Sequence, residues 1–320
     1  MKLLLIELHG MDVSCIKNMK FLRSVAKPKV FKTYTGLAGS YALWTGNSDI
    51  QKGGEYHDHF WNGSSGLWDA NIFRLLRGDL HFSKNRLKNF RLTRTKGYFQ
   101  DRKIFKKFDF SFSERPIIAT NKNFKFDFSK NEIVRIDNFK KYWDKTLNYI
   151  RLNRIDRLSH KYGPNSQEAR KYSEYIDLKI KEIYHEFDGE IIVFAITGMI
   201  KPFKKVNVMS FLGKIKGLVF FVDDENIRIW NKGNTQAIKK AINYINNLHC
   251  GKWLLQKPEK KYGDYFYRAK EGIAFTPNTY VKNDLNGIHT LNGWMISKCG
   301  TIEHIKEFKN LIIKICKEDK

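Results

Sequence analysis

Residues 138–186 read NFKKYWDKTLNYIRLNRIDRLSHKYGPNSQEARKYSEYIDLKIKEIYHE, and this stretch does most to decide the fold class. Its first half carries apolar side chains at helical spacing, namely Phe139, Trp143, Leu147, Ile150, Ile155 and Leu158. The turn-forming residues Gly163-Pro164-Asn165 separate it from a second amphipathic stretch at 166–186. We therefore predict two long helices, at roughly 138–161 and 166–186, that form an αα-hairpin in the middle of the chain.

Short apolar runs on both sides of this hairpin predict strands. They lie at 3–8, 29–35 and 40–45 before it, and at 190–197, 217–222, 226–230 and within 252–281 after it. Further helices are predicted at 12–26, 235–248 and 302–317. Because strands and helices do not alternate regularly, the order favours the α+β class over a doubly wound parallel sheet. We expect one or two domains: an N-terminal α+β region at 1–135 that includes a basic arm at 81–130, then the helical hairpin and an α+β region at 136–320.

The composition excludes several classes of protein. With 42% hydrophobic and 14% aromatic residues, the 320-residue chain has too much apolar surface to stay disordered. Its apolar runs are too short for a transmembrane helix. The four cysteines form no CxxC pair, which argues against a disulfide framework and a zinc ribbon. We therefore expect a soluble protein of the cytoplasm or another reducing compartment.

The charge points to a polyanionic partner. Lys and Arg number 58 against 33 Asp and Glu, a formal net charge of +25. The segment 84–107 holds ten basic side chains and one acid, with Tyr98 and Phe99 among them as candidate stacking residues. Basic side chains can contact phosphates while aromatic rings stack on unpaired bases, so this segment favours RNA or single-stranded DNA. The candidate phosphate contacts are Lys84, Arg86, Lys88, Arg91, Arg94, Lys96, Arg102, Lys103, Lys106 and Lys107.

A second basic stripe lies on the predicted helix 138–161. Arg151, Arg154, Arg157 and Lys161 recur at steps of three and four residues, which would place them on one helix surface. Both stripes favour a protein that binds nucleic acid through largely electrostatic contacts, as a component of a ribonucleoprotein or replication assembly with other protein partners.

A metal-dependent nuclease or phosphodiester transferase is the first alternative. Asp188 and Glu190 flank the start of the predicted strand 190–197, and Asp223 and Asp224 lie between two more strands. If these strand ends meet, the carboxylates could hold Mg²⁺ or Mn²⁺ beside a phosphate. The pair His57 and His59 offers a different metal site, because residues two apart lie on one face of an extended segment.

A cysteine-dependent hydrolase or toxin-like effector is the second alternative. Cys15 lies at the start of the predicted helix 12–26, where a helix dipole can lower the pKa of a thiol. A loop histidine such as His57 or His59 would then act as its base. The sequence leaves open whether the chain is an enzyme at all.

Overall fold

The structure is a computed structural model of the 320-residue chain. It describes residues 1–34, 39, 42–44, 46, 61–62, 67–68, 110–112, 132–141, 143–222, 225–254, 263–276 and 285–317. The predicted arm residues 84–107 and the histidines His57 and His59 lie outside these ranges, as do Asp223 and Asp224.

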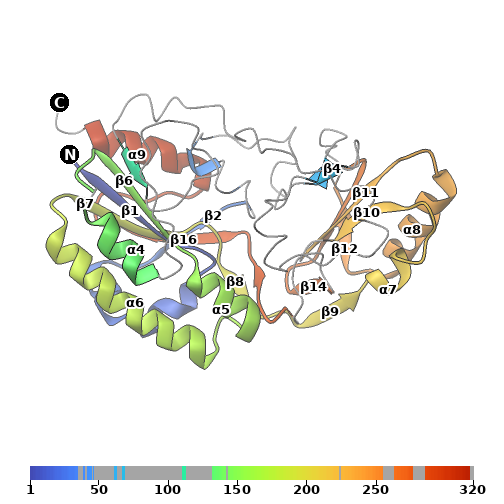
Figure 1. Ribbon diagram of the computed structural model, residues 1–320, viewed down its shortest axis with the longest axis horizontal. Coiled ribbons are helices and arrows are strands. Elements are labelled where there is room, and N and C mark those ends of the chain that lie inside the picture. The colour runs from blue at the N-terminus through green and yellow to red at the C-terminus, as the bar shows by residue number, and fades with distance from the viewer. Residues whose placement is uncertain are drawn as a thin grey trace.

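A six-stranded sheet forms the centre of the larger part of the molecule (Figure 1). Its order is β2-β16-β7-β1-β6-β5, with bounds Lys29–Lys32, Asn292–Ile296, Glu190–Ala195, Leu3–Leu8, Leu147–Leu152 and Phe110–Phe112. The strands β7, β1, β6 and β5 run parallel, whereas β16 runs antiparallel to both β7 and β2. The carboxyl ends of β7, β1 and β6 therefore lie at the same edge of the sheet.

The central strand β1 is buried on both faces. Its sequence LLLIEL does not alternate between apolar and polar residues, because helices cover both faces of the sheet. Leu3 and Leu5 pack on the face covered by α9 (Phe308–Lys317), while Leu4, Ile6 and Leu8 pack on the opposite face. That second face is covered by η1 (Val13–Asn18), α1 (Lys20–Val25), α4 (Glu132–Phe139) and α6 (Gln167–Glu186).

The predicted helix 138–161 is wrong in its first half. Residues 147–152 form β6, and the helix α5 spans only Arg154–Tyr162. Strand β6 is buried on both faces, with Leu147 and Tyr149 in one core and Ile150 and Leu152 in the other. Its apolar positions consequently lack the two-residue period of a half-buried strand and imitate a helical stripe.

The second half of the predicted hairpin is confirmed. Helix α5 ends at Gly163, whose φ of +99° lies outside the helical region, and α6 begins after Ser166. The Ser166 side chain accepts a hydrogen bond from the Ala169 N–H, as an N-cap does. Helix α6 then packs on both α5 and α1.

A second, smaller sheet lies at the other end of the molecule (Figure 1). Its order is β10-β11-β13-β12, with bounds Val219–Val222, Asn226–Trp230, Tyr265–Ala269 and Gly251–Trp253, and its core includes residues of α8 (Thr235–Asn247). The predicted hairpin 217–222 and 226–230 is confirmed by the antiparallel pair β10 and β11. Residues 42–44 are helical, whereas the sequence predicted a strand at 40–45.

Three short ladders complete the described structure. Strand β9 (Lys204–Asn207) pairs with β14 (Ile273–Thr276), β8 (Met199–Ile200) with β15 (Ile288–His289), and β3 (Trp61–Asn62) with β4 (Leu67–Trp68). The remaining helical turns are α7 (Met209–Leu212) and η6 (Ile305–Glu307).

Helices and mixed sheets confirm the α+β class. The predicted boundary near residue 135 stays a prediction, and the six-stranded sheet takes strands from both sides of that position. Within the described ranges, no helix combines the length and the apolar character needed to cross a membrane.

Candidate metal centre

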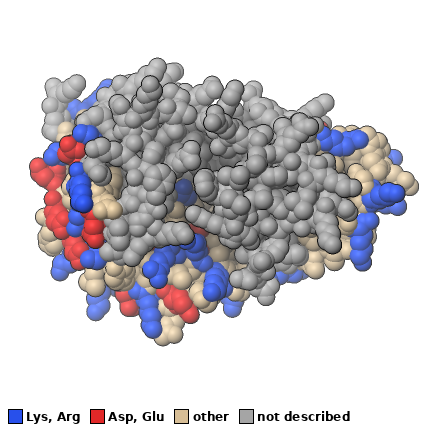
Figure 2. Space-filling model, viewed as in Figure 1, with Lys and Arg blue, Asp and Glu red and all other residues tan. Residues whose placement is uncertain are grey.

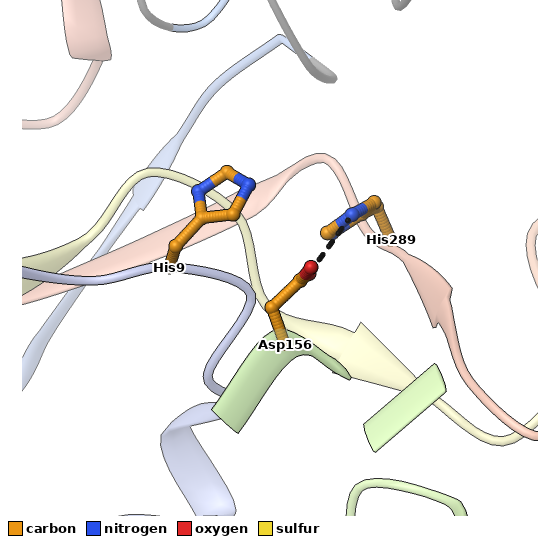
Figure 3. Close-up of side chains that lie close together, drawn as sticks. All are labelled: His9, Asp156 and His289. Atoms are coloured by element: carbon orange, nitrogen blue, oxygen red, sulfur yellow. Dashed lines mark ion pairs between the residues drawn. The ribbon is translucent and has the colours of Figure 1, made fainter. Parts of the chain in front are cut away.

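Three side chains from distant parts of the chain converge at one edge of the large sheet (Figure 3). His9 follows β1, Asp156 lies in the first turn of α5, and His289 ends β15. One ligand atom of each residue lies within 4.8 Å of the others, and the Nε2 of His289 is 3.4 Å from the Oδ1 of Asp156.

The strand register brings these residues together. Strands β1 and β6 run parallel with Leu8 opposite Leu152, and the His9 N–H donates to the Leu152 carbonyl at 3.0 Å. The chain therefore leaves both strands at the same edge, where α5 begins two residues after β6. Pairing of β15 with β8, which follows β7, places His289 at that edge too. Ligands of parallel sheets commonly bind outside the carboxyl ends of the strands.

His160 is a fourth member of the cluster. It lies one helical turn after Asp156 on α5, with its Nε2 3.5 Å from the Asp156 Oδ1, and its ring centroid is 5.0 Å from that of His289. Its Nδ1 lies 2.8 Å from the Gly287 carbonyl oxygen. We call His9, Asp156, His160 and His289 the histidine cluster.

Each histidine of the cluster has its Nδ1 held by another group. The Nδ1 of His9 contacts Glu7 at 2.8 Å, that of His160 contacts the Gly287 carbonyl, and that of His289 contacts the Thr197 hydroxyl at 3.1 Å. This arrangement directs Nε2 inward, and the same pattern of outer partners orients histidine ligands at metal sites.

The electrostatics of the cluster suit a cation. Burial alone would raise the pKa of Asp156, but the nearby His160, His9, His289 and Arg151 hold that pKa below its ordinary value. The Oδ1 of Asp156 is buried and accepts no hydrogen bond from the described residues. Burial lowers the pKa of His289 to about 3, so this ring is neutral and its nitrogen can act as a ligand. A buried carboxylate oxygen without a donor is costly unless a cation contacts it.

The donor set fits a divalent transition metal ion. Bonds of about 2.0–2.1 Å in a tetrahedral site would separate neighbouring ligand atoms by roughly 3.3 Å. The observed separations of 3.4 and 3.5 Å from Asp156 to His289 and His160 are close to that value. Imidazole nitrogens favour zinc and related metals over the Mg²⁺ or Mn²⁺ that the carboxylate hypothesis required.

Comparison with known proteins bears on the same region. The model of the type I phosphodiesterase / nucleotide pyrophosphatase family matches residues 15–268. The chain belongs to this family. The match covers α5 and the strands β6 and β7, whereas His9 lies before its start and His289 after its end. No curated protein matches the sequence of this family member.

Solved structures similar to this phosphodiesterase-family chain include murine and human ectonucleotide pyrophosphatase/phosphodiesterase 5. An inactive form of the murine protein in complex with AMP has a TM-score of 0.69 at 12% identity, covering 98% of this chain and 94% of that chain. The human protein has the same TM-score and identity, covering 99% and 95%. Phosphonoacetate hydrolase from Sinorhizobium meliloti 1021 with phosphonoformate has a TM-score of 0.59 at 12% identity, covering 98% and 95%. At these identities the likeness concerns the fold.

The family assignment favours the phosphodiesterase alternative over a non-catalytic nucleic-acid-binding protein. RNA binding and membership of a ribonucleoprotein gain no support from it. The structure does not bring Asp188 and Glu190 to the histidine cluster, because they lie at the amino end of β7, opposite Leu3 of β1. Glu190 instead accepts a hydrogen bond from the Cys299 thiol at 2.6 Å.

Cys15 has the surroundings of a structural thiol in this phosphodiesterase-family chain. It is 1% exposed and donates to the Pro164 carbonyl at 3.3 Å. Burial raises the pKa of the Cys15 thiol to about 11, with the Asp12 carboxylate adding to the effect. An activated nucleophile needs the opposite shift. The predicted role of Cys15 in a cysteine-dependent hydrolase therefore conflicts with its environment.

The basic stripe predicted on 138–161 does not form a single helical surface. Arg151 belongs to β6, where its Nε lies 3.3 Å from the Oε1 of Glu7. Arg154, Arg157 and Lys161 are exposed on α5, and the Arg154 guanidinium lies over the Tyr172 ring at 5.6 Å. Strand geometry in 147–152 separates Arg151 from the others.

None of the four members of the histidine cluster was predicted as a site residue from the sequence. The spacing of Asp156 and His160, four apart in a helix, was a visible signal for a shared ligand, since such residues lie on one helix face. The histidine His9 directly after a largely apolar strand was a second signal. His289 carried none, because its place depends on the pairing of β15 with β8.

Proposed function

We propose that this chain is a metal-dependent hydrolase of phosphodiester bonds and that the histidine cluster holds its metal ion. The observation that carries the proposal is the convergence of three inward-facing imidazoles on the buried Oδ1 of Asp156. Membership of the type I phosphodiesterase / nucleotide pyrophosphatase family supports the reaction class.

The residues of the histidine cluster offer two kinds of metal ligand. His9, His160 and His289 supply nitrogen donors, and Asp156 supplies the negative charge that offsets part of the charge of the cation. When bound, a divalent cation polarises a phosphoryl oxygen as a Lewis acid. Gly10 makes room for the Asp156 carboxylate, because a Cβ at Gly10 would lie 2.4 Å from Oδ1.

Basic side chains near the cluster favour an anionic substrate, such as a nucleotide or a nucleic acid. The Asn286 N–H donates to the His160 carbonyl, and the Asn286 side chain contacts the Lys161 carbonyl and the Lys205 ammonium. Arg157, Lys161 and Lys205 are all exposed. Lys and Arg side chains reach the surface near the position of α5 and β8 (Figure 2). Such side chains would bind the phosphates of the substrate beside the metal centre.

The experiment compares metal-free and reconstituted full-length protein. Dialysis against a chelator gives the metal-free form, and Zn²⁺, Mn²⁺ or Mg²⁺ is then added back. Hydrolysis of bis(p-nitrophenyl) phosphate, p-nitrophenyl phosphate and phosphonoacetate separates diesterase, monoesterase and phosphonate hydrolase activity. We expect diester hydrolysis that requires the added metal, with Zn²⁺ most effective because the cluster is rich in imidazole.

A matched pair of variants locates the activity. Asp156→Asn removes the carboxylate charge of the cluster and is expected to abolish metal-dependent hydrolysis. Asp177→Asn alters another buried carboxylate, which accepts the Phe21 and Leu22 N–H groups at the start of α1, and is expected to retain activity. Diester hydrolysis that persists in excess chelator, or that survives in Asp156→Asn, would contradict the proposal.

A further inference from the structure

A buried group of charged and polar side chains lies directly behind His9. Glu7 is two residues before His9 on β1, has 0% exposure, and contacts the His9 Nδ1 through its Oε1 at 2.8 Å. Arg151 lies opposite Glu7 in the β1–β6 register, with its Nε 3.3 Å from the same carboxylate oxygen. The Tyr149 hydroxyl donates to the second oxygen, Oε2.

Strand geometry puts these groups on the same side of the sheet. Side chains at alternate positions of a strand share a face, so Glu7 lies on the face of Leu3 and Leu5. Tyr149 and Arg151 occupy the matching positions of β6, and Tyr149 is in the same core as Leu3 and Leu5. The carboxylate therefore bridges the two strands that carry the chain into the histidine cluster.

The contact with Glu7 decides which nitrogen His9 presents. An ionised carboxylate only accepts hydrogen bonds, so the His9 Nδ1 must carry the proton of this contact. The lone pair then belongs to Nε2, the nitrogen that faces the cluster. The Nδ1 of His160 contacts a carbonyl and that of His289 contacts a hydroxyl, whereas the Nδ1 of His9 contacts a carboxylate.

We propose that Glu7 is a positioning residue that holds His9 as a metal ligand, and that Tyr149 and Arg151 hold Glu7 in turn. This inference rests on the metal centre of the proposed function and adds a residue that does not itself reach the ion. It explains why a carboxylate is buried near the carboxyl end of an otherwise apolar strand, a placement that is costly without charged and hydrogen-bonding partners.

The test is metal binding by the full-length protein, measured without any substrate. Zn²⁺ affinity is obtained by competition with a chromophoric chelator, and the visible spectrum of the Co²⁺-loaded protein reports the ligand set. Glu7→Gln keeps the shape but replaces the charged acceptor at Nδ1 with a neutral amide, which holds the Nδ1–H form of His9 less strongly. We expect about a 10- to 100-fold loss of Zn²⁺ affinity and a changed Co²⁺ spectrum.

Two comparisons separate positioning from a general effect on folding. Asp177→Asn, the buried carboxylate at the start of α1, is expected to bind Zn²⁺ within about twofold of the wild-type protein. In a His9→Ala background, Glu7→Gln is expected to cause no further loss of Zn²⁺ affinity, because Glu7 affects the metal only through the His9 ring. If Glu7→Gln does not fold, Tyr149→Phe removes one hydrogen bond from Glu7 and should weaken Zn²⁺ binding by a few-fold.

Each outcome has a distinct meaning. If Glu7→Gln or a folded Tyr149→Phe binds Zn²⁺ like the wild-type protein while His160→Ala does not, the role of Glu7 is refuted and the metal centre stands. If Glu7→Gln weakens binding equally with and without His9, Glu7 does not act through His9, and the inference fails. If the wild-type protein binds no Zn²⁺, this inference and the metal centre fail together.

Discussion

Replacing Gly10 with alanine tests whether the turn after β1 sets the position of Asp156. Gly10 has a φ of +67°, in the left-handed region that glycine adopts most easily. An added Cβ would lie 2.4 Å from the Asp156 Oδ1 and 3.1 Å from its Cβ and Cγ. The substitution therefore strains the backbone and pushes on the carboxylate of the histidine cluster at the same time.

The two effects differ in size and in what they change. Left-handed backbone costs a non-glycine residue about 1–2 kcal/mol, which lowers the free energy of unfolding. To reach ordinary contact at 3.4 Å, Oδ1 must move by about 1 Å. Metal sites tolerate deviations of only about 0.2 Å in ligand distance, so this movement should weaken Zn²⁺ binding at least ~10-fold.

Gly233→Ala is the matched control. Gly233 also has a positive φ, +89°, but an added Cβ would meet nothing within 4 Å. Urea unfolding should show a loss of about 1–2 kcal/mol in both variants. Chelator competition should show weakened Zn²⁺ binding in Gly10→Ala alone.

Two results would refute this reasoning. Wild-type Zn²⁺ affinity in Gly10→Ala would show that the Asp156 carboxylate is not held against Gly10 in the metal-bound protein. Equal losses of affinity in Gly10→Ala and Gly233→Ala would show that backbone strain, not contact with Asp156, is responsible.

Three further predictions concern other parts of the molecule. Cys15, with a thiol pKa of about 11, should be about one part in a thousand thiolate at pH 8. Mass spectrometry should therefore show slower alkylation of Cys15 than of the partly exposed Cys299, and equal rates would contradict its burial. Glu132→Ala leaves the partly buried N–H groups of Asn153 and Arg154, at the start of α5, without their acceptor. It should cost about 2–3 kcal/mol in urea unfolding, and an unchanged midpoint would refute this role. Lys161→Glu combined with Lys205→Glu should raise KM for an oligonucleotide without steepening the salt dependence of that KM. The same variant should leave KM for bis(p-nitrophenyl) phosphate unchanged, and equal effects on both substrates would exclude selective phosphate binding.

Parts of the fold could be predicted from local sequence. The strand 3–8, the turn at Gly163-Pro164-Asn165, helix α6 and the hairpin of β10 and β11 follow from patterns that local sequence carries. The segment 147–152 could not be assigned, because burial on both faces removes the alternation that distinguishes a strand from a helix. The position of Asp188 and Glu190 could not be predicted locally either. Parallel pairing of β7 with β1 sets the strand direction and places both acids at the amino end of β7, away from the histidine cluster.

The apolar segments, the turn before α6, the α+β class and the excess of positive charge can all be inferred from the chain alone, because they depend on neighbouring residues or on composition. The histidine cluster, in contrast, depends on long-range pairing. His9, Asp156 and His289 are distant in the chain and meet because β1 and β6 pair in parallel and β15 pairs with β8. Those pairings are chosen by burial of both faces of the sheet across the whole fold, and no local pattern at the three residues encodes them.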